Sequence, residues 1–345
     1  MTPAPGAVGR SAVLVTGGNS GIGFACAREL ARSGWQVLIA SRDRRASAAA
    51  AERLARDAGA DAVAELALDL GSIESVRRLA REIAARDVPL RALVCNAGLQ
   101  LSGARRVSAD GFELTFAVNH LGHFLLTNLL LERLRAHAPA RIVVVASGVH
   151  DPRLRTGMQK PAVTDVRTLA ETGGPRAGPF DGRLAYVNSK LCNLWFAYEL
   201  GRRIEAANLA SAERPLSVNA FEPGLVPGSG LARDYPPVLR FIWNRILPGV
   251  ARMLTAVIPT INPAWKSGHA LARLVRDPAL TRVSGRYFPS HTRWRDAPSS
   301  DASYDVDRAR LLWEESVRMS RLTSQESPLL GNLSVHRGRA LRGEA

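Results

Sequence analysis

The stretch Leu14-Val15-Thr16-Gly17-Gly18-Asn19-Ser20-Gly21-Ile22-Gly23 decides the fold of this chain. An apolar run that predicts a buried strand leads into it, and the alanine- and leucine-rich segment Phe24–Arg32, which predicts a helix, follows it. Glycines with the spacing G-x-x-x-G-x-G let the backbone turn sharply and approach a ligand, and the first amides of the helix then face an anion. A flexible loop is the plain alternative, but such a turn usually holds a dinucleotide pyrophosphate.

The composition is that of an ordinary globular protein. Of the 345 residues, 46% are hydrophobic and 22% are charged, and the chain is long enough for one large domain or two smaller ones. The three cysteines, Cys26, Cys95 and Cys192, are too few and too scattered for a disulfide framework or a metal site. We therefore expect no metal, a reducing compartment, and buried inert thiols rather than reactive ones.

The net charge of +15 does not indicate a nucleic-acid-binding protein. Only Lys160, Lys190 and Lys266 are lysines, so arginine supplies almost all of the positive charge. The arginines are spread along the chain, and no basic stripe is interleaved with aromatic residues, which indicates compositional bias. An anionic cofactor or substrate is the better interpretation of the charge.

Membrane and export signals are weak. The segment Met1–Gly9 lacks the apolar core of a signal peptide, and no stretch approaches the roughly 20 apolar residues of a spanning helix, so we expect a cytoplasmic protein. Residues 235–263 are apolar but interrupted by arginines and prolines. They predict a hydrophobic wall over a pocket, with an interfacial helix in peripheral contact with a membrane as the alternative.

Short apolar runs alternate with helix-like segments, which is the pattern of βαβ units. Right-handed crossovers between such strands place helices on both faces of one sheet, so the predicted fold is a Rossmann-type, doubly wound parallel α/β sheet. The expected strands are Ala12–Thr16, Gln36–Ala40, Ala62–Ala67, Ala92–Cys95, Arg141–Ala146, Leu216–Phe221 and Arg286–Phe288. The expected helices are Gly23–Ser33, Arg45–Ala58, Ser72–Ala85, Asp110–Leu134, Leu184–Ala206 and Pro263–Val275.

Two regions break this alternation. The segment Val149–Arg183 is long and rich in proline and glycine, so we expect a functional lid or a disordered loop there. From Gln325 onward the chain loses its apolar periodicity. The predicted organisation is a flexible N-terminus (1–10), a single nucleotide-binding domain with an extended substrate loop (11–324) and a disordered tail (325–345).

Tyr186-Val187-Asn188-Ser189-Lys190 is the second informative motif. Residues four apart share a helix face, and an ammonium beside a phenol favours the phenolate, which makes the phenol a better acid or base near neutral pH. Ser147 follows a predicted strand at the sheet edge where such folds bind ligands, and its hydroxyl there can hold a carbonyl oxygen. A surface pair and a turn-capping serine are the plain alternatives.

Five motifs follow one another between Ser11 and Leu231: Thr16-Gly17-x-x-x-Gly21-x-Gly23, Asn96-Ala97-Gly98, Asn119, Ser147 and Tyr186-x-x-x-Lys190. In this order the chain resembles the short-chain dehydrogenase/reductase family, which implies NAD(P)(H)-dependent hydride transfer. The resemblance implies that Tyr186 is the general acid/base and that Ser147 positions the substrate. It also implies that Lys190 holds the nicotinamide ribose and lowers the pKa of the tyrosine, and that Asn119 anchors a water in a proton relay.

The resemblance further implies the cofactor contacts. Asp69 would contact the adenine amino group, Asn96 would line the adenine ribose, and Ser229 stands where the family often has threonine. Besides Tyr186 and Lys190, the expected cofactor-binding residues are Thr16, Gly17, Ser20, Gly21, Ile22, Gly23, Arg42, Asp69, Leu70, Asn96, Ala97, Gly98, Pro223, Gly224, Val226 and Ser229.

Further segments are similar to one branch of the family, which contains the light-dependent protochlorophyllide reductases and the retinol dehydrogenases. These segments are Leu93–Ala97, Asn119–Phe124, Ser189–Asn193, Glu222–Leu231 and Asp277–Thr281, and Ala309–Glu314 looks like the carboxyl-terminal helix of the protochlorophyllide enzymes. The stretch after Ser147 is longer than in many members and unlike those enzymes. Because it would touch the substrate, it leaves the substrate open.

The segment Ser41-Arg42-Asp43 bears on the choice of cofactor. A carboxylate at the end of this strand binds the ribose 2′-hydroxyl of NAD, whereas an arginine grips the 2′-phosphate of NADP. Arg42 therefore predicts NADP(H), and Asp43 keeps NAD open as the alternative.

We therefore expect an NADP(H)-dependent oxidoreductase that transfers a hydride between the nicotinamide and a carbonyl or alcohol. The long walls Val149–Arg183 and Tyr235–Pro263 favour a bulky apolar substrate, such as a retinoid, steroid or polyketide. Reduction of a C=C bond, as in protochlorophyllide, is the alternative activity. A non-catalytic NADP(H)-binding sensor or scaffold is the alternative of another class, although the catalytic residues are all present. The protein would be a monomer or a homodimer.

Overall fold

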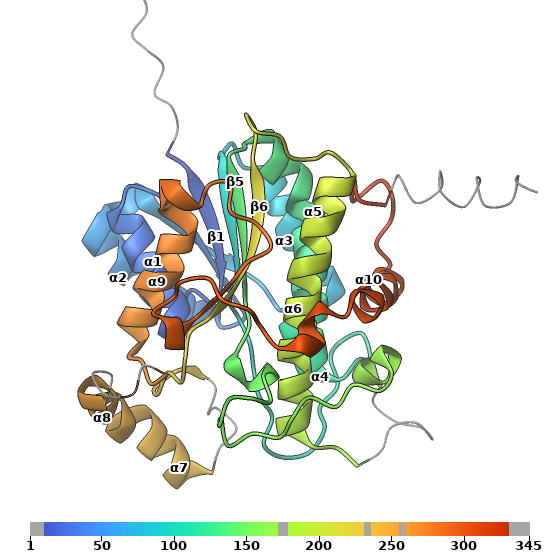
Figure 1. Ribbon diagram of the computed structural model, residues 1–345. Coiled ribbons are helices and arrows are strands. Elements are labelled where there is room, and N and C mark those ends of the chain that lie inside the picture. Colours follow the sequence, from blue (N-terminus) through green and yellow to red (C-terminus); the bar gives the residue numbers. More distant parts are fainter. Residues whose placement is uncertain (1–9, 172–178, 231–235, 255–257, 259, 331–345) are drawn as a thin grey trace, which may run out of the picture.

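The computed structural model describes residues 10–171, 179–230, 236–254, 258 and 260–330. Within them, seven parallel strands form one sheet in the order β3-β2-β1-β4-β5-β6-β7, which confirms the predicted doubly wound architecture (Figure 1). The strands are β1 (Ala12–Thr16), β2 (Gln36–Ser41), β3 (Val63–Ala67), β4 (Leu90–Cys95), β5 (Ala140–Val145), β6 (Leu216–Glu222) and β7 (Tyr287–Pro289). Each lies within two residues of its predicted bounds.

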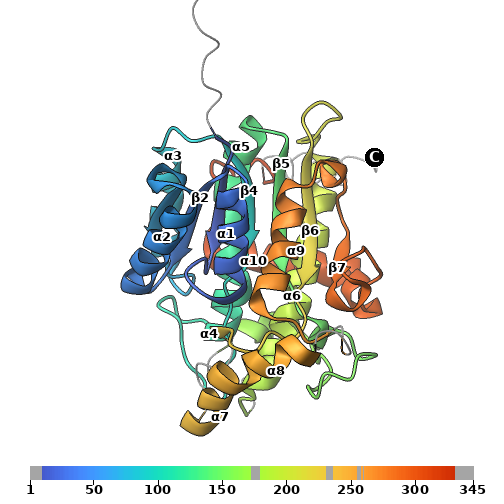
Figure 2. The ribbon, with the colours of Figure 1, turned by 90° about the vertical axis from the view of Figure 1, so that its left-hand side faces the viewer.

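Helices cover both faces of the sheet, as Figures 1 and 2 show. One face carries α1 (Gly21–Arg32), α2 (Arg44–Ala58) and α9 (Ala264–Arg276). The other carries α3 (Ile73–Ala84), α5 (Gly122–Ala136) and α6 (Gly182–Ala206), and α10 (Val306–Ser320) packs on the outer side of α5 and α6. Since successive strand residues point to opposite faces, Val13 and Val15 pack toward the first set of helices and Leu14 toward the second. A sheet covered on both sides explains why its strands are apolar throughout.

The long predicted helix after Asp110 is built from three pieces. A short α4 (Leu114–Phe116) and a π-helical turn (Ala117–Leu121) lead into α5. Together, Leu114–Ala136 are long and apolar enough to cross a membrane by length and composition, but 94% of the apolar window is buried inside the fold. This segment is therefore a core helix.

The described parts of the long loop Val149–Arg183 form an ordered wall along α6. Short 3₁₀ helices lie at Gly148–His150 and Val166–Ala170, and Val166 is buried beside Trp195 of α6. The side chain of Asn188 accepts a hydrogen bond from the backbone N–H of Ala162 at 2.9 Å and donates one to its carbonyl at 3.1 Å. The expectation of disorder is therefore wrong for these parts, because α6 supplies both an apolar groove and a backbone clamp. Residues 172–178 lie outside the described residues.

The tail prediction is wrong for residues 325–330, which pack against the domain. Ser327 donates its hydroxyl proton to the side-chain oxygen of Asn128 at 2.8 Å, Glu326 pairs with Arg77, and Leu329 is buried. This contact is polar, so it adds no apolar residue to the sequence pattern. The apolar periodicity of the sequence therefore ends before the folded part of the chain does. Residues 1–9 and 331–345 lie outside the described residues.

Helix α10 fastens the carboxyl-terminal part of the chain to α5 and α6. The Trp313 ring is 2% exposed and meets the Phe124 ring edge-on, with 4.9 Å between their centroids. The guanidinium carbon of Arg203 lies 4.6 Å from the Trp313 centroid, which adds a cation–π contact. Helix α10 therefore covers the outer side of α6, the helix that carries Tyr186.

We expect Trp313→Ala to lower the free energy of unfolding by about 3–5 kcal/mol, because it opens a cavity between three helices. Arg310→Ala, on the exposed side of α10, serves as the control and should change it by less than about 0.5 kcal/mol. Urea denaturation followed by circular dichroism measures both. Equal midpoints for the two variants would show that α10 is not part of the cooperative unit.

Candidate active site

The glycine-rich turn follows β1 where the strand order reverses between β1 and β4, which is where open α/β sheets bind ligands. Gly17 and Gly21 have positive φ angles of 66° and 56°. A Cβ atom on Gly23 would lie 2.4 Å from the carbonyl oxygen of Gly17, so α1 can pack against the turn only with glycine at this position. Glycine is thus required at positions 17 and 21 by the positive φ angles, and at position 23 by close packing.

The first turn of α1 presents backbone amides to the cleft. Ser20 precedes the helix in an extended conformation, its side chain makes no capping hydrogen bond, and the first turn contains no acidic residue. The first N–H groups of a helix have no partner inside the helix. The amides of Gly21, Ile22 and Gly23 therefore remain to bind an anion, so this turn fits a pyrophosphate.

The Thr16 hydroxyl fastens β1 to the turn that follows β4. Its oxygen accepts hydrogen bonds from the backbone N–H groups of Asn96 at 2.9 Å and Ala97 at 3.0 Å, and lies 2.9 Å from Nε2 of His123. Because Nδ1 of His123 lies 3.1 Å from the carbonyl oxygen of Asn119, we assign the ring proton to Nδ1. Two acceptors, Nε2 of His123 and the Val94 carbonyl oxygen at 3.2 Å, then lie within reach of the Thr16 hydroxyl proton. Burial lowers the pKa of His123 to about 4, so the ring stays neutral.

Lys190 reaches from α6 to the carboxyl end of β5. Its Nζ donates a hydrogen bond to the carbonyl oxygen of Val145 at 3.1 Å and lies 5.6 Å from the ring centroid of Tyr186. The expected pairing of amine and phenol on one helix face is therefore present. Burial lowers the pKa of Lys190 to about 8, so the amine is still largely protonated at neutral pH.

Asn119 lies on the π-helical turn and bridges β4 to α6. Its Nδ2 donates to the hydroxyl of Ser189 at 2.9 Å, and that hydroxyl donates to the carbonyl oxygen of Tyr186 at 2.7 Å. Its Oδ1 accepts the backbone N–H of Leu99 at 2.8 Å. A Cβ atom on Gly98 would lie 3.3 Å from Oδ1 of Asn119 and 3.6 Å from Nζ of Lys190, which places all three groups at one point of the cleft.

Ser147 lies two residues beyond the end of β5, beside the Val145 carbonyl that Lys190 holds. The Ser147 carbonyl oxygen accepts a hydrogen bond from Nδ1 of His150 at 2.6 Å, and Nε2 of His150 accepts the backbone N–H of Ser300 at 3.3 Å. Burial lowers the pKa of His150, so its ring stays neutral and keeps both bonds. The sequence analysis missed this clamp, because a lone histidine in a loop belongs to no pattern.

The Pro223-Gly224 segment is shaped by the buried carboxylate of Glu222. One oxygen accepts the Gly224 N–H at 2.6 Å, and the other accepts the backbone N–H and the hydroxyl of Ser290 at 2.8 Å and 2.7 Å. Gly224 has φ 82°, and a Cβ there would lie 2.5 Å from the carbonyl oxygen of Thr260. The sequence analysis quoted Glu222 only as part of a motif and gave it no role.

The same segment returns to the glycine turn. Val226 is buried, and a Cβ atom on Gly21 would lie 3.7 Å from Cα of Ser229. The expected cofactor-binding residues after β1 and after β6 therefore face one cleft.

The adenosine end of the predicted site lies after β2 and β3. Arg42 is exposed, whereas the Asp43 carboxylate caps α2 by accepting the backbone N–H of Ala46 at 3.0 Å. Asp69 accepts the backbone N–H of Gly71 at 2.9 Å, which fixes the turn after β3. Leu70 is buried, and its carbonyl oxygen would lie 2.4 Å from a Cβ atom on Gly122, so it packs directly against α5.

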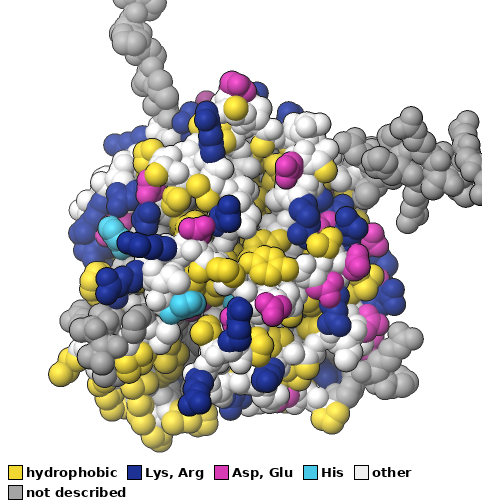
Figure 3. Space-filling model, in the orientation of Figure 1, with side chains coloured by type: hydrophobic (Ala, Val, Ile, Leu, Met, Phe, Trp, Pro, Cys, Tyr) yellow, Lys and Arg dark blue, Asp and Glu magenta, His cyan; other side chains and the backbone are white. Residues whose placement is uncertain are grey.

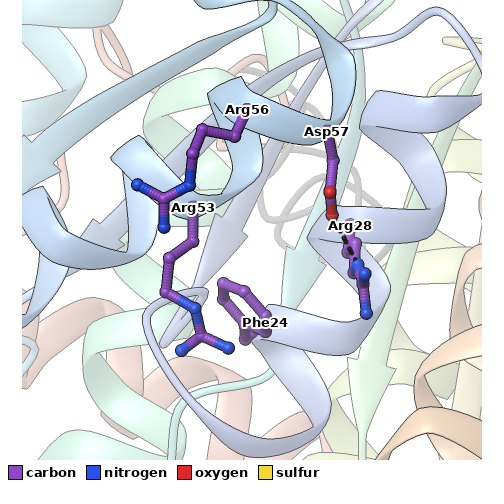
Figure 4. A pocket seen from close by; sticks show the side chains of 5 residues that line it. All are labelled: Phe24, Arg28, Arg53, Arg56 and Asp57. Atoms are coloured by element: carbon purple, nitrogen blue, oxygen red, sulfur yellow. Dashed lines mark hydrogen bonds and ion pairs between the residues drawn. The ribbon is translucent and has the colours of Figure 1, made fainter.

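A separate hollow of about 170 Å³ lies between α1 and α2 (Figure 4). It is lined by Phe24, Arg28, Arg53, Arg56 and Asp57. The Arg53 guanidinium lies over the Phe24 ring, 4.5 Å from its centroid, and Arg28 pairs with Asp57 at 2.6 Å. None of the predicted site residues lines this hollow, so it is distinct from the predicted site.

Two further groups of residues are the three cysteines and the side chains able to bind a metal ion. The three cysteines are free and buried, and burial raises the pKa of Cys95 to about 12 and that of the other two further, which confirms inert thiols. Among the described residues no cluster of histidine, cysteine and carboxylate side chains suits a metal ion.

The chain is similar in sequence to several known proteins. A family model described as short chain dehydrogenase matches residues 11–155. Protochlorophyllide reductase A of Oryza sativa subsp. japonica is 34% identical over 327 residues, covering 89% of this chain and 80% of that protein. A WW domain-containing oxidoreductase of Danio rerio is 35% identical over 307 residues, covering 89% of this chain and 68% of that protein.

Solved structures show the same fold. The RhlG/NADP complex of Pseudomonas aeruginosa superposes with a TM-score of 0.56 at 24% identity, covering 82% of this chain and 95% of that one. A blue fluorescent protein from a metagenomic library, in complex with NADPH, gives a TM-score of 0.54 at 20% identity, covering 80% and 94%.

We expect Thr16→Val to destabilise the fold by about 1–3 kcal/mol, because the half-buried Ala97 amide loses its acceptor and the Asn96 amide keeps only the Val94 carbonyl. Thr16→Ser keeps the hydroxyl and should cost only about 1 kcal/mol for the lost methyl group. Thermal unfolding of the two variants measures the difference. If serine and valine proved equally costly, the hydroxyl would not be what joins β1 to β4.

Proposed function

Because the chain belongs to the short-chain dehydrogenase/reductase family of oxidoreductases, we propose that it is an NADP(H)-dependent reductase acting on a carbonyl group of a bulky apolar substrate. The observation that carries this proposal is the buried amine of Lys190, held by the Val145 carbonyl at 3.1 Å and placed 5.6 Å from the Tyr186 ring. In the reverse direction the same site oxidises an alcohol.

The residues of the cleft fit NADP(H), which supplies the hydride when bound. The amides at the start of α1 would hold its pyrophosphate, and Lys190 would hold the ribose next to the nicotinamide. Arg42 would grip the 2′-phosphate, and capping of α2 by Asp43 removes the carboxylate that would favour NAD. Solved structures of the same fold in complex with NADP or NADPH support this choice.

We assign proton transfer to the side chains near the carboxyl end of β5. Tyr186 donates it to the substrate oxygen in the reductive direction, and the neighbouring Lys190 ammonium favours the phenolate that remains. The Ser147 hydroxyl holds the substrate oxygen, and the His150 clamp on its carbonyl keeps that turn in place. Asn119, bonded to Ser189 and Leu99, orders the helix behind the tyrosine.

The apolar substrate is inferred from the walls of the cleft. The described parts of Val149–Arg183 form one wall, and the helical segment that follows Ser229 forms the other, with Trp243 donating to the Ser229 carbonyl at 3.1 Å. Retinoid-, steroid- or polyketide-like ketones and aldehydes suit such walls.

A second candidate is the reduction of a C=C bond in a tetrapyrrole. It is favoured by the relatives named protochlorophyllide reductase, such as that of rice at 34% identity over 89% of this chain. An experiment distinguishes the two candidates, since the second requires the purified protein to bind the pigment and, as we expect, to turn it over only under light.

A non-catalytic sensor is disfavoured because Asn119, Ser147, Tyr186 and Lys190 are all present. We further propose that the protein is cytoplasmic, because its three cysteines are free, and that it is a monomer, because α10 covers the outer side of α6.

We expect Tyr186→Phe to lower the rate of NADPH oxidation, with a panel of hydrophobic ketones and aldehydes, by about 100- to 10,000-fold, because the proton donor is lost. Tyr198→Phe, a buried tyrosine on the same helix that bonds Ser299 at 2.7 Å, is the matched control and should retain most of the activity. NADPH affinity should be little changed in either variant. Equal rates for wild type and Tyr186→Phe would remove the phenol from the mechanism.

We expect Arg42→Ala to weaken NADPH binding by about 10- to 100-fold, because a charge-assisted hydrogen bond to the 2′-phosphate is lost. NADH, which has no such phosphate, should bind as before. Arg56→Ala, an exposed arginine of α2 in the separate hollow, is the control. Titration of cofactor fluorescence gives both affinities, and a loss that is equal for the two cofactors would contradict the assignment.

A further inference from the structure

An apolar ridge lies at the carboxyl edge of the sheet, beside the cleft. It is formed by α7 (Pro237–Phe241), a π-helical turn (Ile242–Ile246) and α8 (Leu247–Leu254). Figure 3 shows hydrophobic side chains gathered at the lower left of the molecule, where Figure 1 places α7 and α8. The large side chains of the ridge that are between 39% and 79% exposed are Val238, Leu239, Phe241, Ile246, Val250 and Met253.

These side chains do not serve the core of the domain. No residue of α7 or of the π-helical turn is buried, although the segment is predominantly apolar. Single exposed hydrophobic residues are common on soluble proteins, but a contiguous exposed group of this kind marks an interaction surface. The ridge therefore needs a partner.

The charge of the region identifies the partner as anionic. The described residues of the ridge, 236–254, contain no aspartate or glutamate, whereas Arg240, Arg245 and Arg252 are cationic. Arg240 and Arg245 are exposed on the ridge itself. A helix that combines exposed apolar side chains with arginines, and that carries no acid, is typical of one lying in the headgroup region of an anionic bilayer.

A second copy of this chain is the poorer partner. A symmetric contact through the ridge would bring Arg240 and Arg245 of both copies into one interface, which gathers positive charge there. The net charge of +15 adds a general repulsion between copies. Both effects vanish when the partner is a negatively charged lipid surface.

The ridge is joined to the cofactor cleft. Trp243 donates its indole N–H to the Ser229 carbonyl at 3.1 Å, and Ser229 packs against Gly21 of the glycine turn. A surface that engages the ridge would therefore lie next to the mouth of the cleft, which gives an apolar molecule dissolved in that surface a short path to it.

We propose that the apolar ridge docks the protein on anionic phospholipid bilayers, with its apolar side chains at headgroup depth and its arginines on the lipid phosphates. The proposal goes beyond the reaction proposed above and does not rest on it, because lipid binding is measured without turnover.

The test uses the full chain and vesicles of phosphatidylcholine, alone or mixed with phosphatidylglycerol, in a flotation assay. We expect the wild type to float with the mixed vesicles and to be released as the salt concentration rises. Phe241→Ser/Met253→Ser and Arg240→Glu/Arg245→Glu should each lower the bound fraction by about tenfold or more. Val107→Ser, at another exposed hydrophobic residue, and Arg310→Glu, at another exposed arginine, are the matched controls and should bind as the wild type.

The outcomes are distinct. Failure of the wild type to bind mixed vesicles, or equal binding of wild type and ridge variants, overturns the proposal. A dimer in sedimentation velocity without lipid, which the ridge variants dissociate, also overturns it, because the ridge would then be a contact between copies. Unchanged circular dichroism and NADPH binding in the ridge variants show that the variants are folded, and the salt dependence of the wild type tests the proposal without any variant.

Discussion

The site depends on a buried amine. Lys190 is 4% exposed, and burial lowers the pKa of its side chain from 10.5 to about 8. Below about pH 8 the amine is charged in both the folded and the unfolded chain, so the cost of its burial is fully present. Between about pH 8 and 10.5 the folded chain releases the proton first, and this cost diminishes as the pH rises. The Val145 carbonyl alone does not offset the loss of water around the amine, so Lys190 opposes folding at neutral pH, which is common for groups at functional sites.

The groups around Lys190 are held by hydrogen bonds at the ends of strands. Thr16 ties β1 to the turn after β4, Glu222 ties β6 to Ser290, and His150 ties the turn after β5 to Ser300. Because the strands are parallel, all these ends lie at one edge of the sheet, and each clamp fixes a loop that faces the cleft. The clamps are buried, and both histidines involved are neutral since burial lowers their pKa. Rigid loops of this kind hold a reacting group in place, so little free energy is needed to reorganise the site during the reaction.

Much of this arrangement was predictable from the sequence. The strands and the glycine turn follow from apolar runs and from the steric need for glycine, which are local properties of the chain. The clamps of His150 and Glu222 could not be found in this way, because each joins residues far apart in the sequence and has no period or spacing. The start of the tail was misplaced for the same reason, since Ser327 is held by Asn128 and not by an apolar pattern. The sequence therefore indicates the candidate catalytic side chains more readily than the long-range contacts that orient them.

The two surfaces outside the sheet differ in a way that bears on substrate access. On the side of α6, helix α10 buries Trp313 against Phe124, so that side is closed by a core-like contact. At the carboxyl edge, α7 buries no residue, and Phe241 of α7 and Met253 of α8 are exposed. Helix α10 thus buries a large aromatic side chain, whereas the ridge leaves six large apolar side chains exposed, which is typical of an interaction surface. An apolar edge beside the cleft is expected where the substrate is itself apolar and arrives from a phase that dissolves it.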